Sequence, residues 1–385
     1  MRIRNGLRRF TNYLLVIVLA CSLSFLPACV TQPPNSPDNE SELPSGGGTE
    51  DRIFTDAAGR ILAVPGIAAL NKIYFGGGPA ELICLSLAPE LAGGTTYEFL
   101  SEADLALLPA QLKSLPYLGT QSSGGQINVE SLLAEGIQLM ITMPFGTPTA
   151  KDVEDADDIQ LKTGIPVVII DGTFEKIPDT YRLLGELLGK QAEAAKLIDY
   201  FNKITDDVAG ALANVPESER VSVYYAEGSD GLQTEPSTSP HAFILTLAGA
   251  RNVAIVDTTE QVGMSNVSME QVLAWDPEVI IAWSSSYRGG AADLIRSDSL
   301  WQPVQAVQDG RVYDMPSSPF PWIDRPPSIN RLLGLQWVAN LLYHDSYDVD
   351  MVKEVKEFYS LFYHADISDS QAQQLLGSSY PAYRP

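Results

Sequence analysis

Short runs of apolar, β-branched residues alternate along the chain with stretches in which apolar residues recur at helical spacing. The runs predict strands at residues 53–64 (a hairpin), 72–75, 91–94, 165–171, 221–226, 254–256 and 310–315. The helical spacing predicts helices at residues 80–87, 102–108, 150–163, 241–248, 296–307 (interrupted by Trp-Gln-Pro at 301–303), 328–343 (amphipathic and capped by Ser328) and 352–363. Such alternation is typical of a parallel or mixed sheet covered by helices on both faces, so the pattern predicts an α/β fold.

One helix–strand pattern occurs twice, at residues 127–143 and again at residues 267–283. When the two copies are aligned from their first positions, Glu130 falls on Glu270 and Leu133 on Leu273, and the apolar types agree at most other positions. The repeat predicts two lobes of related architecture. The alternative is that any junction between a helix and a buried strand looks like this.

The middle of the chain has a different character. Residues 179–215 carry no strand pattern, and two apolar stripes at helical spacing are separated by Gly189. A single helix over residues 191–214 would span about 36 Å at 1.5 Å per residue. Such a helix is long enough to cross from one lobe to the other.

Residues 1–28 have the pattern of a signal peptide: four arginines, then an apolar stretch, then small residues before Cys29. The tetrapeptide that ends in Cys29 resembles a bacterial lipobox, although Pro27 departs from its usual pattern, and Cys21 is a second candidate for lipidation. The alternative is an uncleaved membrane anchor. Residues 29–50, rich in Pro, Ser, Gly and acidic residues, predict a disordered tether.

The charge of the chain excludes one class of partner. The sequence holds 25 basic and 48 acidic residues, a net charge of −23. Without the four arginines of residues 1–28, the net charge becomes 21 − 48 = −27, which disfavours nucleic acid as a partner. After cleavage and lipidation at Cys29, the only remaining thiol is that of Cys84, so no disulfide framework is expected.

Taken in order, these patterns resemble the substrate-binding lipoproteins of ABC importers for iron complexes, siderophores, haem and corrinoids. The resemblance rests on the hairpin at residues 55–60 (TDAAGR), both repeated units, the long central helix, and residues 300–307 (LWQPVQAV) with 310–313 (GRVY). It covers residues 53–343. It implies the class III fold of the helical-backbone metal receptors, in which two Rossmann-like lobes are joined by one long α-helix and enclose the ligand.

The resemblance implies a division of the chain and a partner. Residues 51–190 would form the N-terminal lobe, 191–214 the interlobe helix, 215–345 the C-terminal lobe and 346–385 a helical tail. The partner would be an ABC permease dimer, and no cofactor is expected. Residues 319–331 (PFPWIDRPPSINR) resemble a branch that binds molybdate or tungstate, or nickel and iron chelates. An iron complex or a related metal-containing solute is therefore predicted, with a molybdate or tungstate oxyanion as the alternative.

Candidate ligand-binding residues follow strand ends and loops, where α/β folds place their ligands. The glycine loop could present backbone N–H groups to an anion, or form an ordinary tight turn. Arg325 suits an oxyanion or carboxylate, or could pair with Asp324 to stiffen its loop. The aromatic residues could line a cleft or pack in the core. The set comprises Tyr74, Gly76, Gly77, Gly78, Tyr225, Glu227, Trp283, Tyr287, Trp322 and Arg325.

Three further residues carry predictions of other kinds. The resemblance implies that Glu130 and Glu270 dock onto arginines of the permease, whereas the alternative is a carboxylate that favours the positive end of its helix. His241 is a weak candidate for a metal ligand, since a residue at the start of a helix needs no such role.

The sequence contains no pattern typical of an enzyme. The nucleophile motif G-x-S-x-G and the zinc motif HExxH are both missing from the sequence. A hydrolase of the cell envelope and a tethered adhesion module are the rival functions. The repeated units and the long helix favour a solute-binding protein over both.

Overall fold

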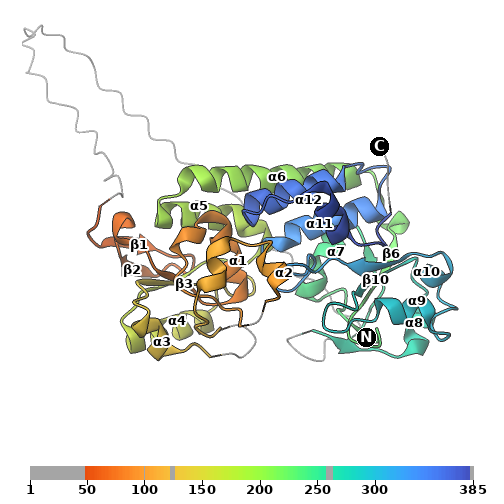
Figure 1. Cartoon of the computed structure of the whole chain (residues 1–385). Helices are drawn as coiled ribbons and strands as arrows, with labels where there is room; N and C mark the ends of the chain where they lie inside the picture. Colours follow the sequence, from red (N-terminus) through yellow and green to blue (C-terminus); the bar gives the residue numbers. More distant parts are fainter. Residues whose placement is uncertain (1–47, 99, 122–125, 257–262, 382–385) are drawn as a thin grey trace, which may run out of the picture. The chain divides into compact units, whose positions relative to one another are not determined.

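The long helix expected in the middle of the chain is present as α6, Gln191–Leu212. The computed structural model describes residues 48–98, 100–121, 126–256 and 263–381, and Figure 1 shows α6 running along one side of this part. With 22 residues, α6 is about 33 Å long and ends two residues before the predicted boundary. The predicted signal peptide, Cys29 and most of the tether lie outside the described residues.

Three parallel strands form the sheet of the N-terminal lobe, in the order β3 (Ile73–Phe75), β4 (Leu139–Thr142) and β5 (Val167–Ile169). The predicted hairpin is confirmed as β1 (Arg52–Thr55) and β2 (Ile61–Val64). The helices of this lobe are α1 (Gly78–Leu87), α2 (Glu102–Leu105), α3 (Val129–Ala134) and α4 (Ala150–Thr163). All residues of β3 and β5 are buried, as expected for a parallel sheet covered on both faces.

Four parallel strands form the C-terminal sheet, in the order β11 (Val312–Met315), β10 (Val279–Trp283), β6 (Ser222–Ala226) and β8 (Arg251–Asn252). Its helices are α7 (Phe243–Leu247), α8 (Met269–Trp275), α9 (Ala292–Ser297) and α10 (Gln305–Gln308). A short antiparallel ribbon joins β7 (Gln233–Thr234) to β9 (Ser265–Asn266). The predicted α/β class is therefore confirmed for both halves.

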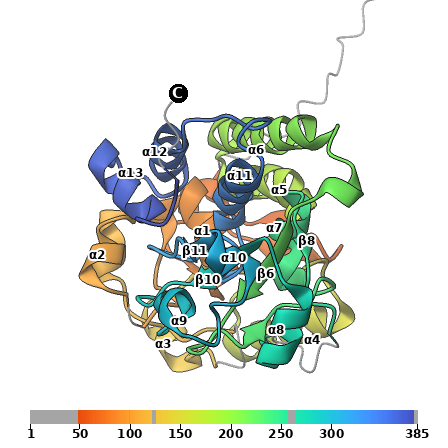
Figure 2. The ribbon, with the colours of Figure 1, turned by 90° about the vertical axis from the view of Figure 1, so that its right-hand side faces the viewer.

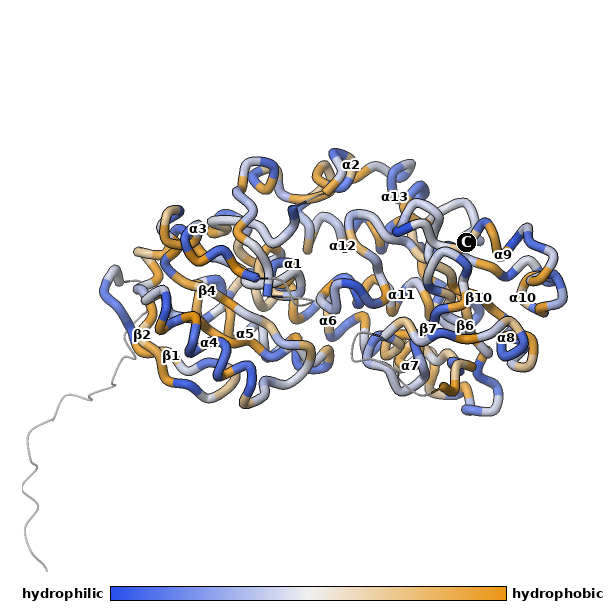
Figure 3. Tube along the Cα trace, turned by 90° about the horizontal axis from the view of Figure 1, so that it is seen from below, coloured by the Kyte–Doolittle hydropathy of each residue, from blue (hydrophilic) through white to orange (hydrophobic). Residues whose placement is uncertain are grey.

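A helical layer packs against α6. It consists of α5 (Ile177–Leu188), α11 (Asn330–Leu342), α12 (Met351–Phe362) and α13 (Asp369–Leu376). Figure 2 shows α6, α11 and α12 on one side of the C-terminal sheet, with α8 and α9 on the other. Hydrophobic residues follow the strands of both sheets (Figure 3). In the part of the chain that the structure describes, no helix is long and apolar enough to span a membrane.

The repeated unit is present in both lobes, as α3 with β4 and as α8 with β10. The turn between helix and strand contains a left-handed residue at the same place, Gly136 with φ 69° and Asp276 with φ 40°. Leu132 and Val272, which the same alignment pairs, are both fully buried. The alignment read from the sequence therefore matches corresponding elements of the two lobes.

The structure corrects the sequence-based expectations for two short strands. The strand predicted at residues 254–256 is wrong: the strand at this place is β8, three residues earlier, and Ile255 is 81% exposed. At residues 91–94 there is only a single bridge at Ala92, after a 3-10 turn over Pro89–Leu91. Both segments are apolar enough to suggest a strand, but each is too short to add to the sheet beside it.

The helix predicted at residues 328–343 is α11, but two of its expected features are wrong. It is not amphipathic, because all thirteen of its residues are buried. Ser328 does not cap it; the N-cap residue is Ile329, and the Ser328 hydroxyl donates to the Pro79 carbonyl oxygen over 2.8 Å. Helix α11 is thus a core element of the fold. The hydrogen bond of Ser328 connects the start of this helix to the N-terminal lobe.

Candidate functional site

The carboxyl ends of β6 and β10 lead into a network of buried polar side chains. The Trp283 indole N–H donates to the Tyr225 hydroxyl over 3.0 Å, and that hydroxyl lies 3.2 Å from Asp324 Oδ1, to which it can donate. Asp324 belongs to the proline-rich loop that follows β11. Tyr225, Trp283 and Asp324 are at most 1% exposed. The structure therefore joins two strand ends and the loop in one network, whereas a role of Tyr225 and Trp283 in lining a ligand cleft stays a prediction.

Arg325 lies among three carboxylates. Its guanidinium donates to Glu227 Oε1 over 2.6 Å, to Glu235 Oε1 over 2.7 Å, and to Asp324. All three acidic side chains are fully buried, and the guanidinium lies over the Trp283 ring at 5.5 Å from the centroid. The Arg325–Asp324 pair is the alternative that the sequence left open, and it is present. Contact between Arg325 and a ligand stays a prediction.

The pKa values in this cluster follow from burial and from close charges. Burial, together with the charge of Asp324, raises the pKa of Glu227 well above its usual value. Burial alone would lower the pKa of Arg325, but the Asp324 and Glu227 carboxylates outweigh it and raise that pKa. Arg325 therefore stays charged, and its charge is already matched by acidic neighbours.

His241 adjoins the cluster and connects it to the N-terminal lobe. Its Nδ1 lies 3.9 Å from Asp324 Oδ2, and its ring stacks on Phe145 at 5.0 Å between centroids. Phe145 follows β4 and His241 lies in the 3-10 turn Pro240–Ala242 before α7, so the stack joins the segment after β4 to the C-terminal lobe. Burial, followed by the charge of Arg325, lowers the pKa of His241. The imidazole is therefore neutral at neutral pH and available as a ligand.

The glycine loop between β3 and α1 lies against the proline-rich loop. A Cβ on Gly78 would come within 2.6 Å of the Tyr97 hydroxyl and 3.5 Å of Pro326 Cβ, so glycine permits this close approach. A Cβ on Gly76 would meet Met140 Cε at 2.4 Å, and Gly77 is the N-cap residue of α1. These contacts agree with the tight-turn alternative, and anion binding by the loop stays a prediction.

Three aromatic candidates occupy different surroundings. Tyr74 is fully buried within β3, and its hydroxyl donates to the Gly119 carbonyl oxygen over 2.6 Å. Trp322 is also fully buried and packs at the start of the helical layer, against α11. Tyr287 packs edge-on against Trp283 at 5.2 Å between centroids. Only Tyr287 is directly beside the Tyr225–Trp283 network.

The proposed docking glutamates occupy equivalent positions. Glu130 is the second residue of α3 and Glu270 the second residue of α8, and both side chains are exposed. An exposed leucine follows three residues later in each helix, Leu133 at 52% and Leu273 at 39% exposure. Hydrogen bonds from its own backbone N–H and from Ser268 lower the pKa of Glu270. Each lobe therefore presents the same pair, one acidic and one apolar, at the start of a matching helix.

Sequence reasoning missed two residues of the site, Glu235 and Arg331. Glu235 is fully buried, where it accepts from Ser239 Oγ over 2.6 Å as well as from Arg325. Arg331 is 5% exposed, donates to the Pro240 carbonyl oxygen and lies over the Phe145 ring at 5.3 Å. In the sequence, Glu235 and Arg331 stand out only as charged residues within apolar or turn-forming segments. Such a position does not show whether a side chain is buried.

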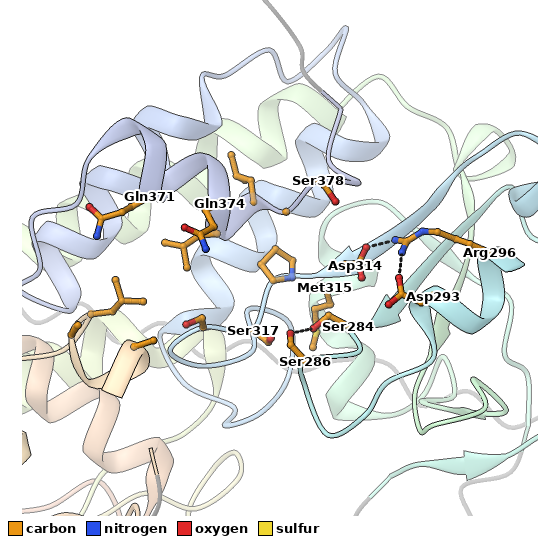
Figure 4. A pocket seen from close by; sticks show the side chains of 18 residues that line it. Ser284, Ser286, Asp293, Arg296, Asp314, Met315, Ser317, Gln371, Gln374 and Ser378 are labelled. Atoms are coloured by element: carbon orange, nitrogen blue, oxygen red, sulfur yellow. Dashed lines mark hydrogen bonds and ion pairs between the residues drawn. The ribbon is translucent and has the colours of Figure 1, made fainter. Parts of the chain in front are cut away.

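A cavity of about 580 Å³, lined by both polar and apolar side chains, opens beside this network. It is bounded by α2, by the segments that follow β10 and β11, and by α13 (Figure 4). Arg296 on its wall pairs with Asp293 at 3.1 Å and with Asp314, and Ser284 and Ser286 share a hydrogen bond of 3.0 Å. Met315 also lines it, and its sulfur lies 3.1 Å from the Tyr225 hydroxyl. The cavity is thus one side chain away from the buried cluster.

Comparisons with known proteins agree with this architecture. The profile of the family described as "Periplasmic binding protein" matches residues 118–319. The molybdate-binding protein MolA of Haemophilus influenzae is 30% identical over 226 residues, 58% of each protein. The Fe(3+)-citrate-binding protein YfmC of Bacillus subtilis is 24% identical over 159 residues, 40% of this chain and 48% of that protein. The matches thus span about half the length of these two relatives.

A solved structure extends the comparison to nearly the whole fold. An ABC transporter solute-binding protein from Sulfurospirillum deleyianum superposes with a TM-score of 0.75 at 30% identity. The match covers 84% of this chain and 98% of that protein. The similarity therefore includes both sheets and the helices that pack against them.

Proposed function

The chain belongs to the periplasmic binding protein family, and on that premise we propose that it is an extracytoplasmic solute-binding lipoprotein of an ABC importer. In this proposal, it captures a metal-containing solute between its lobes and delivers it unchanged to the permease dimer, without enzymatic activity of its own. Residues 51–190 and 215–345 serve as the lobes and residues 191–214 as their connection. Cys29 carries the lipid that keeps the protein at the membrane.

The observation that carries the proposal is the convergence of both lobes on the buried cluster. The stack of Phe145 on His241 brings the end of β4 to the side of Asp324 and Arg325. Ligands of α/β proteins bind at the carboxyl ends of strands, which is where this cluster lies. A deeply buried set of acidic, basic and imidazole groups is also the kind of site where perturbed pKa values indicate function.

The charges of the cluster favour an iron complex or a similar chelate over a free oxyanion. Arg325 is engaged by three acidic side chains, so its charge is already matched and little of it is left to attract an anion. The positive centre of a metal complex would instead be attracted. The names of the relatives include both kinds of solute, molybdate in one and Fe(3+)-citrate in the other.

Molybdate or tungstate is the second candidate, and Arg331 is the observation in its favour. Burial lowers the pKa of Arg331 to about 10, so this side chain is still charged at neutral pH. Within the described residues, it pairs with no carboxylate, and its Nε has no hydrogen-bond partner. A buried guanidinium with an open N–H group suits one oxygen of an oxyanion.

Transport provides the test of the proposal. We expect cells that lack this chain to lose uptake of one radiolabelled metal complex, and the wild-type chain to restore it. Glu130→Lys with Glu270→Lys should abolish the restored uptake, because both lobes would then repel basic residues of the permease. Solute affinity of the purified variant should stay unchanged.

A matched control is available on the surface of the same lobes. Glu186→Lys with Glu219→Lys would alter the net charge equally at exposed positions on α5 and in the turn Glu217–Glu219, away from α3 and α8, and should leave uptake intact. Equal loss of uptake in both double variants would contradict the docking role. Uptake that does not depend on the chain would contradict the transport function itself.

A further inference from the structure

We propose that Glu235, His241 and Asp324 ligate the metal of the solute directly. The solute is then a first-row transition-metal ion held by a carboxylate chelator that leaves coordination positions open to the protein. This inference rests on the proposed function, because it assigns the ligands within the proposed site.

The spacing of the three side chains suits a shared metal ion. One ligand atom from each lies within 4.8 Å of the others, and His241 Nδ1 is 3.9 Å from Asp324 Oδ2. That distance is too long for a hydrogen bond. Two ligands at about 2.1 Å from one metal are separated by about 3 to 4.2 Å, depending on the angle between them. The gap between His241 and Asp324 therefore has the width of a coordinated ion, which would share Asp324 Oδ2 with the Arg325 guanidinium.

Two buried atoms of the cluster lack the hydrogen bonds that such atoms normally make. In the described part of the chain, neither His241 Nδ1 nor Glu227 Oε2 has a hydrogen-bond partner. Glu227 is fully buried, and its other oxygen is bound to Arg325 beside Asp324. Buried polar atoms are rarely left without partners, so these two point to a ligand.

The surroundings of the carboxylates hold them in place for coordination. Glu235 accepts from Ser239 Oγ at 2.6 Å and from the Met264 backbone N–H at 3.1 Å, and Asp324 is within hydrogen-bond distance of the Tyr225 hydroxyl. Such outer contacts fix the orientation of metal ligands and tune their basicity. The two carboxylates are therefore held in fixed orientations by buried hydrogen bonds.

The donor atoms define the class of metal. Two carboxylates and one imidazole, without a thiolate, suit iron, nickel, cobalt or zinc more than copper(I). Cys84, the one free cysteine among the described residues, is buried in α1 and is not part of the cluster. A chelator that fills every position of the metal would leave none for these side chains. Molybdate is an anion, so its own oxygens, rather than a positive metal centre, would face these acidic side chains.

Arg331 is the residue that would bind an anionic group of the chelator. Its guanidinium lies over Phe145, the ring that also stacks on His241, so an anionic group on the solute could reach it from the metal position. A metal cation beside the carboxylates and a carboxylate of the chelator beside Arg331 would each meet the opposite charge.

Calorimetric titration of the full chain tests the inference. The probes are Fe(III)–citrate and Ni(II)–citrate, with the EDTA complexes of the same metals as saturated counterparts and molybdate as the oxyanion. We expect a citrate complex to bind and the EDTA complexes and molybdate not to bind. His241→Ala should weaken that binding by at least about 10- to 100-fold, the loss that removing even an outer contact of a metal ligand causes.

Two controls separate loss of ligation from loss of folding. His241→Ala removes a ring whose Nδ1 has no partner in the described structure, so the variant should unfold at nearly the wild-type temperature. His344→Ala, at the end of α11 and outside the cluster, should bind as the wild type does. With Co(II)–citrate, the visible spectrum should change on addition of wild-type chain and not on addition of His241→Ala.

The outcomes distinguish this inference from the function on which it rests. Tight binding of an EDTA complex or of molybdate, without binding of a citrate complex, would overturn direct ligation and leave solute binding in place. Equal affinity of wild type and His241→Ala for the citrate complexes would overturn it as well. If none of the probes bound, both the inference and the proposed metal-containing solute would fall.

Discussion

Replacing Arg325 by methionine should destabilise the protein severely and in a pH-dependent way. The substitution removes one guanidinium that donates to Glu227, Glu235 and Asp324, all fully buried. Methionine fills a similar volume but provides neither a charge nor a donor. Breaking a buried ion pair by removing one partner costs about 3–5 kcal/mol, because the remaining charge stays buried. With three acceptors on one donor, we expect a loss at or above the upper end of that range at pH 7.

The pH dependence follows from proton binding. Burial and Asp324 already raise the pKa of Glu227, and Arg325 is the group that opposes this rise. Without Arg325, the folded variant binds protons more tightly than its unfolded chain does. Its stability is then greatest below the unfolded carboxyl pKa of about 4 and falls as pH rises through the folded pKa. The difference from wild type should therefore be small near pH 4 and large near pH 8.

Urea unfolding followed by tryptophan fluorescence measures this difference, since Trp283 lies against Arg325. Arg182→Met is the matched control: its ion pair with Asp179 is exposed at 60% and 57%, and such pairs contribute about 1 kcal/mol or less. A loss for Arg325→Met below about 1 kcal/mol, or one that is constant from pH 4 to pH 8, would refute the cluster as a buried charge network. Partial rescue by a bound metal complex would add support for ligation.

Two further predictions concern the lobes. Burial raises the pKa of Glu81 to about 7, although hydrogen bonds from Thr95 and Thr96 oppose the rise. This carboxyl therefore contributes up to about 3 kcal/mol to the free energy of unfolding below pH 4.5, and the contribution is lost as pH rises to 7. Glu81→Gln should remove this decrease of the free energy of unfolding with pH in urea unfolding, and an unchanged decrease would argue against the role of Glu81. Gly334→Ala places a Cβ 2.0 Å from the Trp322 carbonyl oxygen, so it should cost several kcal/mol in thermal unfolding, whereas Gly210→Ala, with open space at its Cβ, should not destabilise.

The repeated unit shows how far the sequence alone could lead. Gly136 and Asp276 both occupy left-handed turns, and paired residues of the two copies agree in burial: Leu132 and Val272 are buried, whereas the two leucines that follow them are exposed. Local chemistry determines such a turn, so aligning the two copies identified matching elements. The same holds for α6, whose apolar stripe and lack of proline are visible in the sequence.

The site could be predicted only in part, because burial of charge depends on tertiary contacts. Glu227 and Arg325 follow a strand and a proline-rich segment, which is a recognisable position for a ligand-binding residue. Glu235 is fully buried, yet its neighbours in the chain are Thr, Pro and Ser, a composition typical of an exposed loop. What buries it is the arginine contributed 90 residues later. No local sequence pattern predicts this ion pair between Glu235 and Arg325.

The polar residues of one helix led to a wrong prediction of an amphipathic helix, because their burial depends on tertiary packing. Helix α11 contains Asn330, Arg331, Gln336 and Asn340, which suggested a polar face, but each of these side chains is buried. Asn340 donates to the Tyr347 carbonyl oxygen over 2.8 Å, and Gln336 donates to Glu354 over 3.2 Å. Partners from α12 and from the loop before it therefore accept from the amide groups of Gln336 and Asn340, which lowers the cost of burying this side of the helix.

Thermal unfolding of the full chain with a panel of metal-containing solutes would decide whether the protein binds such a solute at all. The panel comprises ferric siderophores, Fe(III)–citrate, Ni(II)–histidine, haem, cobalamin, molybdate and tungstate, each at a concentration well above micromolar affinity. A solute present at 100 times its Kd stabilises the folded state by about 2.7 kcal/mol, which raises Tm by about 4 °C for a chain of this size. We expect such a rise with one chemical class of the panel. No rise with any member, together with turnover of an ester or peptide substrate, would show that the protein is not a solute-binding protein of this kind.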